Sequence, residues 1–161
     1  MLTFLNLEAE GFCSIESLHL QLNPTCTILI KAPNGKGKST ILSALVWAIY
    51  GKNLKGVSEV NTWKQVRPKD YKGTKVQVYF QKDSHTYKIV RCQKYDEVLE
   101  DGAKGKDRLI FMKDGDIVDI KGKGKIQDFI NREIGLSYTL FMNSIMFGQG
   151  IKRLIQESNS D

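Results

Sequence analysis

The sequence predicts a mixed α/β domain in which a helix that begins at a glycine loop is combined with an antiparallel, β-rich lobe. Two observations predict this class. Apolar residues with helical spacing follow a loop rich in glycine and lysine at residues 31–37, and several short runs with β-type alternation are joined by turn-forming residues. The length of 161 residues and the apolar share of 41% are typical of one globular domain, so we expect residues 1–161 to form a single unit.

The first elements are predicted to be strands. Apolar and polar residues alternate over residues 2–10 in part and over residues 15–22 more clearly, with Gly11 between the two runs, which favours a hairpin. Pro24 ends the hairpin. The β-branched apolar run at residues 25–30 then predicts a third strand, buried on both faces of a sheet.

The next unit is predicted to be a loop followed by a helix. Residues 31–37 form the loop, apolar residues at 41, 42, 45, 46 and 49 predict a helix over residues 38–50, and Gly51 ends it. Residues 52–75 have little periodicity and are expected to be a surface segment.

The second half is predicted to contain two hairpins and two helices. Residues 75–80 and 86–92 form the first hairpin, and residues 109–112 and 117–120 flank the turn-forming pair Asp114 and Gly115 in the second. Residues 97–107 are expected to be a polar turn region. A helix over residues 126–134 ends at Gly135, and Ser137 caps another that extends to about residue 145.

Composition and charge exclude several classes of protein. The apolar stretch at residues 44–49 is far shorter than the roughly 20 residues that span a bilayer, so we expect a soluble, unsecreted, cytoplasmic protein without a membrane partner. Cys13, Cys26 and Cys92 form no metal-binding or disulfide pattern. The net charge of +6 comes from residues 61–125, and it is compatible with a polyanionic partner or with a solvated face.

The strongest motif is a phosphate-binding loop. Residues 32–39 match the pattern [AG]xxxxGK[ST] and lie between a predicted strand and a helix start, where backbone N–H groups converge on phosphate oxygens. We expect Lys38 to reach the β and γ phosphates, Ser39 to offer its hydroxyl to Mg²⁺, and Thr40 to support the α-phosphate. The predicted ligands are a nucleoside triphosphate and Mg²⁺, and the loop residues are Asn34, Gly35, Lys36, Gly37, Lys38, Ser39 and Thr40.

A P-loop site also needs a carboxylate at the end of a neighbouring apolar strand, and the sequence offers no good candidate. Asp114 follows the run at residues 109–112, but Lys113 interrupts the run and Gly115 makes Asp114 a hairpin tip. The second glycine and lysine repeat, at residues 121–126, has no hydroxyl residue after it and is interpreted as a solvated loop. The sequence therefore predicts half of a nucleotide site.

Five segments together resemble the N-terminal half of the ATPase head of SMC-like DNA-repair ATPases of the SbcC type, which include bacteriophage recombination-endonuclease subunits. They are residues 11–15, 32–40, 48–51, 87–91 and 147–150. Ala32 departs from the first glycine of many members. Cys13 stands where several relatives carry an arginine near the nucleotide.

The resemblance implies a fold and a set of partners. It implies a P-loop NTPase fold, the N-terminal lobe of an ABC-type head, that binds ATP and Mg²⁺ and in which Gln149 is catalytic and touches Mg²⁺ or the attacking water. It also implies a coiled coil and a C-terminal lobe beyond residues 1–161, a second head in a homodimer, a nuclease subunit, and double-stranded DNA bound through its backbone phosphates by the basic residues of the 104–125 hairpin. The compartment implied is the cytoplasm of a bacterial or phage-infected cell. ATPase activity is expected only when the second lobe and second head complete the site.

Two other functions remain open at this stage. The chain could be a nucleotide-binding domain fragment of a transporter or another ABC ATPase, although the hairpin at residues 109–120 fits transporters poorly. It could also be a basic DNA-binding module with a vestigial loop, against which the intact Lys38 and Ser39 argue.

Overall fold

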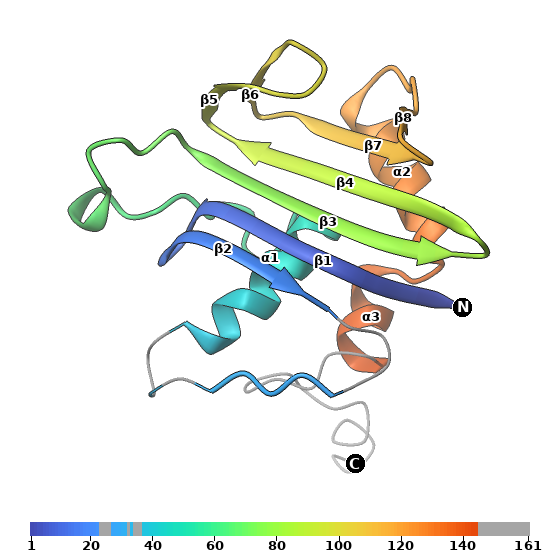
Figure 1. The fold of residues 1–161 in the computed structure, drawn as a ribbon, viewed down its shortest axis with the longest axis horizontal. Coiled ribbons are helices and arrows are strands. Elements are labelled where there is room, and N and C mark those ends of the chain that lie inside the picture. The colour runs from blue at the N-terminus through green and yellow to red at the C-terminus, as the bar shows by residue number, and fades with distance from the viewer. Residues whose placement is uncertain (23–26, 32, 34–36, 145–161) are drawn as a thin grey trace, which may run out of the picture.

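A six-stranded antiparallel sheet organises the fold. The structure is a computed structural model that describes residues 1–22, 27–31, 33 and 37–144. The strands lie in the order β2-β1-β3-β4-β7-β8, and helices pack on one face of this sheet (Figure 1). In chain order the elements are β1 (Leu2–Phe12), β2 (Ile15–Gln21), α1 (Lys38–Tyr50), the short 3-10 helix η1 (Lys64–Val66), β3 (Thr74–Lys82), β4 (His85–Gln93), β5 (Tyr95–Val98), β6 (Lys104–Lys106), β7 (Leu109–Lys113), β8 (Asp116–Ile117), α2 (Lys123–Ile134) and α3 (Tyr138–Ser144).

The core lies between the sheet and the helices. In β3, Val76, Val78 and Phe80 are buried against the helices, whereas Lys75 and Gln77 belong to the opposite face, as the alternation of a strand requires. The strands that neighbour β3 contribute further buried residues at matching register positions. Helices α1, α2 and α3 contribute the rest of the core. The sheet-side members include Leu7, Ala9, Ile89 and Phe111, and the helix-side members include Val46, Trp47, Ile130 and Phe141.

The opposite face of the sheet carries a second, smaller layer. Strands β5 and β6 pair with each other in a two-stranded sheet. A small apolar cluster of Val90, Cys92, Tyr95 and Ile110 joins this pair to β4 and β7. The prediction that residues 97–107 form a polar turn region was therefore incomplete, because β5 and β6 pair in this region and Tyr95 packs in the small apolar cluster.

Helix α1 begins and ends where the sequence predicts. Six consecutive residues, 44–49, are buried, because the helix is enclosed by the sheet and by α2. Gly51 ends α1 at φ 73°, and its N–H donates to the carbonyl of Trp47 at 2.7 Å. The predicted hairpins, the helix ending at Gly135 and the cap at Ser137 are also present, with the N–H of Leu140 donating to the Ser137 hydroxyl at 3.3 Å. The second strand of the last hairpin is shorter than predicted, because β8 covers only Asp116–Ile117 and residues 118–120 are not in a strand.

Three sequence predictions were wrong in part. Residues 27–30 form no strand, because β1 is the only neighbour of β2 and nothing in the described residues pairs with this segment. Residues 123–125, predicted as loop, form the exposed first turn of α2. Residues 60–62, predicted as surface, are buried because Asn61 bridges to Phe12 beside the first hairpin.

Candidate nucleotide-binding site

The site is built at the amino end of α1. Gly37 precedes the helix with φ 85°, a left-handed conformation that glycine adopts without a Cβ penalty. Its carbonyl accepts the N–H groups of Thr40 and Ile41 at 3.0 and 3.3 Å, which starts the helix. The first turn therefore holds Lys38, Ser39 and Thr40, the three residues to which the sequence assigns phosphate and metal contacts.

Two contacts shape the loop around this helix start. The ammonium of Lys38 donates to the carbonyl of Pro33 at 3.3 Å, so the side chain points back toward Pro33. A Cβ placed on Gly37 would lie 3.4 Å from the Ser14 hydroxyl, which puts the β1–β2 turn beside Gly37. Ser14 is a residue that sequence reasoning did not assign to the site, since no spacing rule relates a hairpin turn to a later loop.

The electrostatics of this helix end suit an anion. The first turn of α1 contains no acidic residue, and the helix dipole places partial positive charge there. A triphosphate with Mg²⁺ fits this set of groups, which combines helix N–H donors, the Lys38 ammonium and the Ser39 hydroxyl. The other assigned residues, Asn34, Gly35, Lys36 and Gln149, lie outside the described residues.

The carboxyl end of α1 is held by a buried arginine. Arg91 on β4 is only 6% exposed, and its guanidinium donates to the carbonyls of Ala48 at 2.9 Å and Ile49 at 3.2 Å. It also donates to the side-chain oxygen of Gln127 on α2. Burial lowers the pKa of Arg91 to about 10, so the group remains charged at neutral pH and complements the negative end of the helix. The sequence feature that could have identified Arg91 is a cationic residue within a strand of mostly apolar residues.

The same end of α1 is tied to the last described helices. The Gln127 amide donates to the carbonyl of Ile49 at 2.8 Å, and the Tyr50 hydroxyl donates to the carbonyl of Leu136 at 2.9 Å. The Tyr50 ring packs edge-on against Tyr138 and Phe141 of α3. The phosphate-loop helix is thereby coupled to the segment that precedes residue 145.

Asp114 lies at the tip of the β7–β8 hairpin, as predicted, and it has a structural role there. Its carboxylate accepts the N–H of Thr86 at 2.9 Å and contacts His85 at 2.6 Å, joining two hairpin turns. The Thr86 amide and His85 lower the pKa of Asp114. In Figure 1 this hairpin and the start of α1 lie at opposite ends of the sheet.

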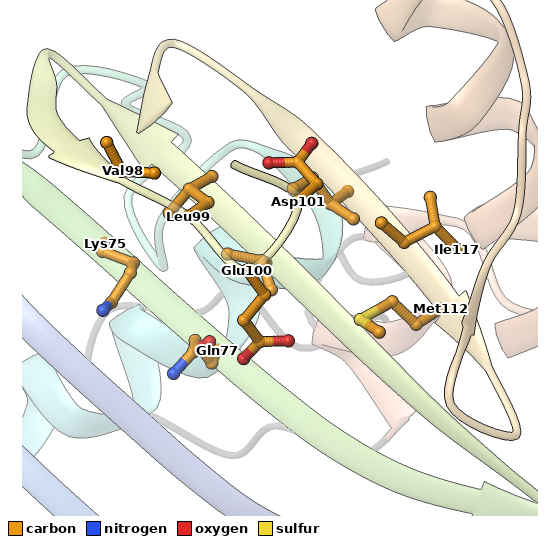
Figure 2. Close-up of a pocket in the computed structure, with 10 residues that line it drawn as sticks. Lys75, Gln77, Val98, Leu99, Glu100, Asp101, Met112 and Ile117 are labelled. Atoms are coloured by element: carbon orange, nitrogen blue, oxygen red, sulfur yellow. The ribbon is translucent and has the colours of Figure 1, made fainter. Parts of the chain in front are cut away.

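A separate cavity of about 120 Å³ lies on the other side of the sheet. Figure 2 shows its lining, with Lys75 and Gln77 from β3, residues 98–101 from the segment that starts in β5, Met112 from β7 and Ile117 from β8. Its charged groups are engaged elsewhere, because Lys75 pairs with Glu10 at 2.8 Å and Asp101 pairs with Arg108. Nothing in this arrangement resembles a phosphate site.

Comparison with known proteins supports the sequence resemblance. Over 157 residues the chain is 27% identical to a probable DNA double-strand break repair Rad50 ATPase of Aquifex aeolicus, covering 96% of this chain and 15% of that protein. Over 161 residues it is 22% identical to a DNA double-strand break repair Rad50 ATPase of Methanopyrus kandleri, covering 96% of this chain and 17% of that protein. The chain thus spans only about a sixth of the length of these relatives.

Solved structures show the same fold. One matching structure comes from work on the ATP-driven dimerization and DNA-stimulated activation of SMC ATPases. Its TM-score is 0.56 at 19% identity, and the match covers 97% of this chain and 96% of that one. The recombination mediator RecF bound to ATP matches with a TM-score of 0.52 at 19% identity, covering 78% of this chain and 30% of that one. The predicted fold class is therefore confirmed.

The part of the chain that the structure describes contains no helix long and apolar enough to cross a membrane.

The predicted resemblance to SMC-like DNA-repair ATPase heads is confirmed by these relatives and by the family model. That model matches residues 6–161, and the chain belongs to the AAA domain family, AAA_23.

Proposed function

We propose that this chain is the N-terminal, ATP-binding lobe of the ATPase head of an SMC-like DNA-repair ATPase. The observation that carries the proposal is the start of α1, where Gly37 in the left-handed conformation leads directly into Lys38, Ser39 and Thr40 with no acidic residue in that turn. The similarity to Rad50 ATPases over 96% of the chain supports DNA-break processing as the context.

Each group at the helix start has a defined task in this proposal. The N–H groups of the first turn and the Lys38 ammonium bind phosphate oxygens, and the Ser39 hydroxyl is a ligand for Mg²⁺. Bound Mg²⁺ supplies neutralisation of the negative charge that develops on the phosphates. Thr40, which is partly exposed, supports the α-phosphate, and Gln149 is assigned to the metal or the attacking water.

The active head requires more polypeptide than this chain. Residues 27–31 precede the loop and have no strand partner among the residues that the structure describes, and Leu29 is 73% exposed. An apolar segment whose backbone pairs with no strand of the described residues, beside a phosphate loop, suits pairing with another strand. We therefore assign the missing carboxylates to a C-terminal lobe joined through a coiled coil, and we include a second head as homodimer partner, a nuclease subunit and duplex DNA in the working complex.

The proposal is tested by nucleotide binding to the complete 161-residue chain. ATP with Mg²⁺ should raise the melting temperature of the wild-type chain, and Lys38→Ala should abolish the increase. Lys125→Ala is the matched control, because Lys125 lies in the exposed first turn of α2 within the other glycine and lysine repeat. It should leave the nucleotide effect unchanged.

Steady-state hydrolysis by the same chain should be close to background. Rapid turnover that Lys38→Ala abolishes would mean that a complete site exists within these residues, and the split-head assignment would be wrong. Absence of any ATP effect on the melting temperature would instead favour a DNA-binding module whose loop is vestigial.

A further inference from the structure

The loop between α1 and β3 presents an exposed tryptophan among basic residues. Within residues 63–72, here named the Trp63 loop, the side chains of Trp63 and Val66 are 76% and 63% exposed. The loop contains four basic residues, Lys64, Arg67, Lys69 and Lys72, against one acidic residue, Asp70. In Figure 1 this segment, the green stretch that contains one short helical turn, projects beyond the end of the sheet. An exposed indole in a cationic loop is unlike the scattered apolar residues of an ordinary surface.

The Trp63 loop is held at its base by hydrogen bonds. The N–H of Thr62 donates to the Tyr71 hydroxyl at 3.2 Å, and that hydroxyl donates to the side-chain oxygen of Asn61 at 3.1 Å. The Arg67 guanidinium donates to the carbonyl of Thr62 at 2.6 Å and lies 4.6 Å from the centre of the Tyr71 ring. The loop therefore presents Trp63 from a fixed base, which reduces the entropy lost when a ligand binds.

Much of the charge on this loop is available to a ligand. Lys72 pairs with Glu97 at 3.0 Å, but Lys64 and Lys69 are exposed and have no acidic partner among the described residues. In the hairpin region that the family resemblance associates with DNA, several cations are already engaged. Lys104 pairs with Asp96 at 2.8 Å, and Arg108 pairs with Asp101.

An open groove of about 580 Å³ lies beside the indole, lined by residues 61–65, Arg67 and Glu59. The Glu59 carboxylate is occupied by the Asn61 amide and by Lys94 at 3.3 Å. An anionic chain that also carries flat, apolar rings matches both the free cations and the indole. A purely apolar protein surface would leave Lys64 and Lys69 desolvated without a partner, which is costly.

We propose that the Trp63 loop binds a DNA strand, with the indole stacked on an unpaired base and Lys64, Lys69 and Arg67 against backbone phosphates. This inference rests on the proposed function, which makes DNA the substrate, and it adds a preference for single-stranded or frayed DNA. Stacking of this kind tolerates any base, so the loop grips the strand without reading its sequence.

The test uses the complete chain and a single-stranded oligothymidylate of about 20 nucleotides. The anisotropy of a fluorescent dye on the oligonucleotide measures the affinity of the wild type and of every variant, because Trp63→Ala and Trp63→Phe lack the reporting indole. In the wild type, where the other tryptophan, Trp47, is buried at 3% exposure, quenching of the indole emission also reports on Trp63 directly. Trp63→Ala should weaken binding by about 10- to 100-fold, whereas Trp63→Phe should retain most of the affinity. Lys64→Gln and Lys69→Gln should each lower the slope of log affinity against log salt by about 0.7, the value for one phosphate contact on a single strand.

The outcomes separate this inference from the proposed function. If ATP still raises the melting temperature of Trp63→Ala and only DNA binding is weakened, both stand. If ATP stabilises the wild type but Trp63→Ala binds the oligonucleotide equally well, the loop assignment is wrong and the proposed function is unaffected. If the main consequence of Trp63→Ala is loss of the ATP effect, the indole lies at the nucleotide. If the main consequence is dissociation of a dimer, the indole lies at an interface between copies. Either result would overturn the loop assignment.

Discussion

Replacement of Arg91 by methionine tests how the phosphate-loop helix is held. Methionine keeps most of the apolar stem but removes the guanidinium that donates to the carbonyls of Ala48 and Ile49. Ile49 keeps a partner in the Gln127 amide at 2.8 Å, whereas the Ala48 carbonyl loses the donor that Arg91 provides. One buried carbonyl without a partner costs about 1–3 kcal/mol, and the lost charge at the helix end costs about 0.3–2 kcal/mol.

The expected result is a loss of about 1–4 kcal/mol in the free energy of unfolding, because relief of the Arg91 desolvation cost offsets part of the sum. Urea unfolding followed by circular dichroism, extrapolated linearly to water, measures this value. Arg132→Met is the matched control, since Arg132 is exposed on α2 and lies over the Phe129 ring in a cation–π arrangement at 5.4 Å. It should cost less than about 1 kcal/mol.

A result for Arg91→Met that equals the control would refute the reasoning. It would mean either that water hydrogen-bonds to the carbonyls at the end of α1 or that the helix end moves without cost. In both cases the arginine does not hold the helix. A gain in stability would show that the desolvation of the guanidinium outweighs its hydrogen bonds.

Three further changes test other parts of the fold. Gly51→Ala should lower the free energy of unfolding more than Gly56→Ala does, because both have positive φ (73° and 75°) but only the Gly51 Cβ would meet Arg91, at 3.1 Å; equal losses in urea unfolding would argue against the contact. Phe111→Ala, at a site 1% exposed, should cost about 3–5 kcal/mol in the same assay, and a cost below about 1 kcal/mol would contradict the packing. Because the pKa of Asp114 lies below its ordinary value of 3.8, its contribution to stability is present above that value and is lost as the pH falls through the lowered pKa. Asp114→Asn should therefore have a smaller drop in melting temperature than the wild type between about pH 6 and about pH 3, and an unchanged drop would exclude the carboxylate as its source.

Local pattern predicted most of the elements and failed where pairing partners are distant. The hairpins and α1 were predictable because alternation, turn residues and the glycine at position 51 act within a few residues of one another. The run at residues 25–30 has the composition of a strand, yet its described part forms none, since a strand requires a neighbour that no local pattern supplies. The order of strands was likewise not readable, because β1 pairs with both its sequence neighbour β2 and the distant β3.

The sequence by itself determined the phosphate-loop motif and the helix that follows it, because both depend on residue types at short, fixed spacing. The tertiary structure alone decided that Ser14 lies against Gly37, that Arg91 holds the far end of α1, and that Trp63 projects from a loop whose Lys64 and Lys69 have no acidic partner among the described residues. Burial and exposure depend on which distant segments the fold brings together. A charged side chain in a strand and an indole in a loop acquire their roles only from those neighbours.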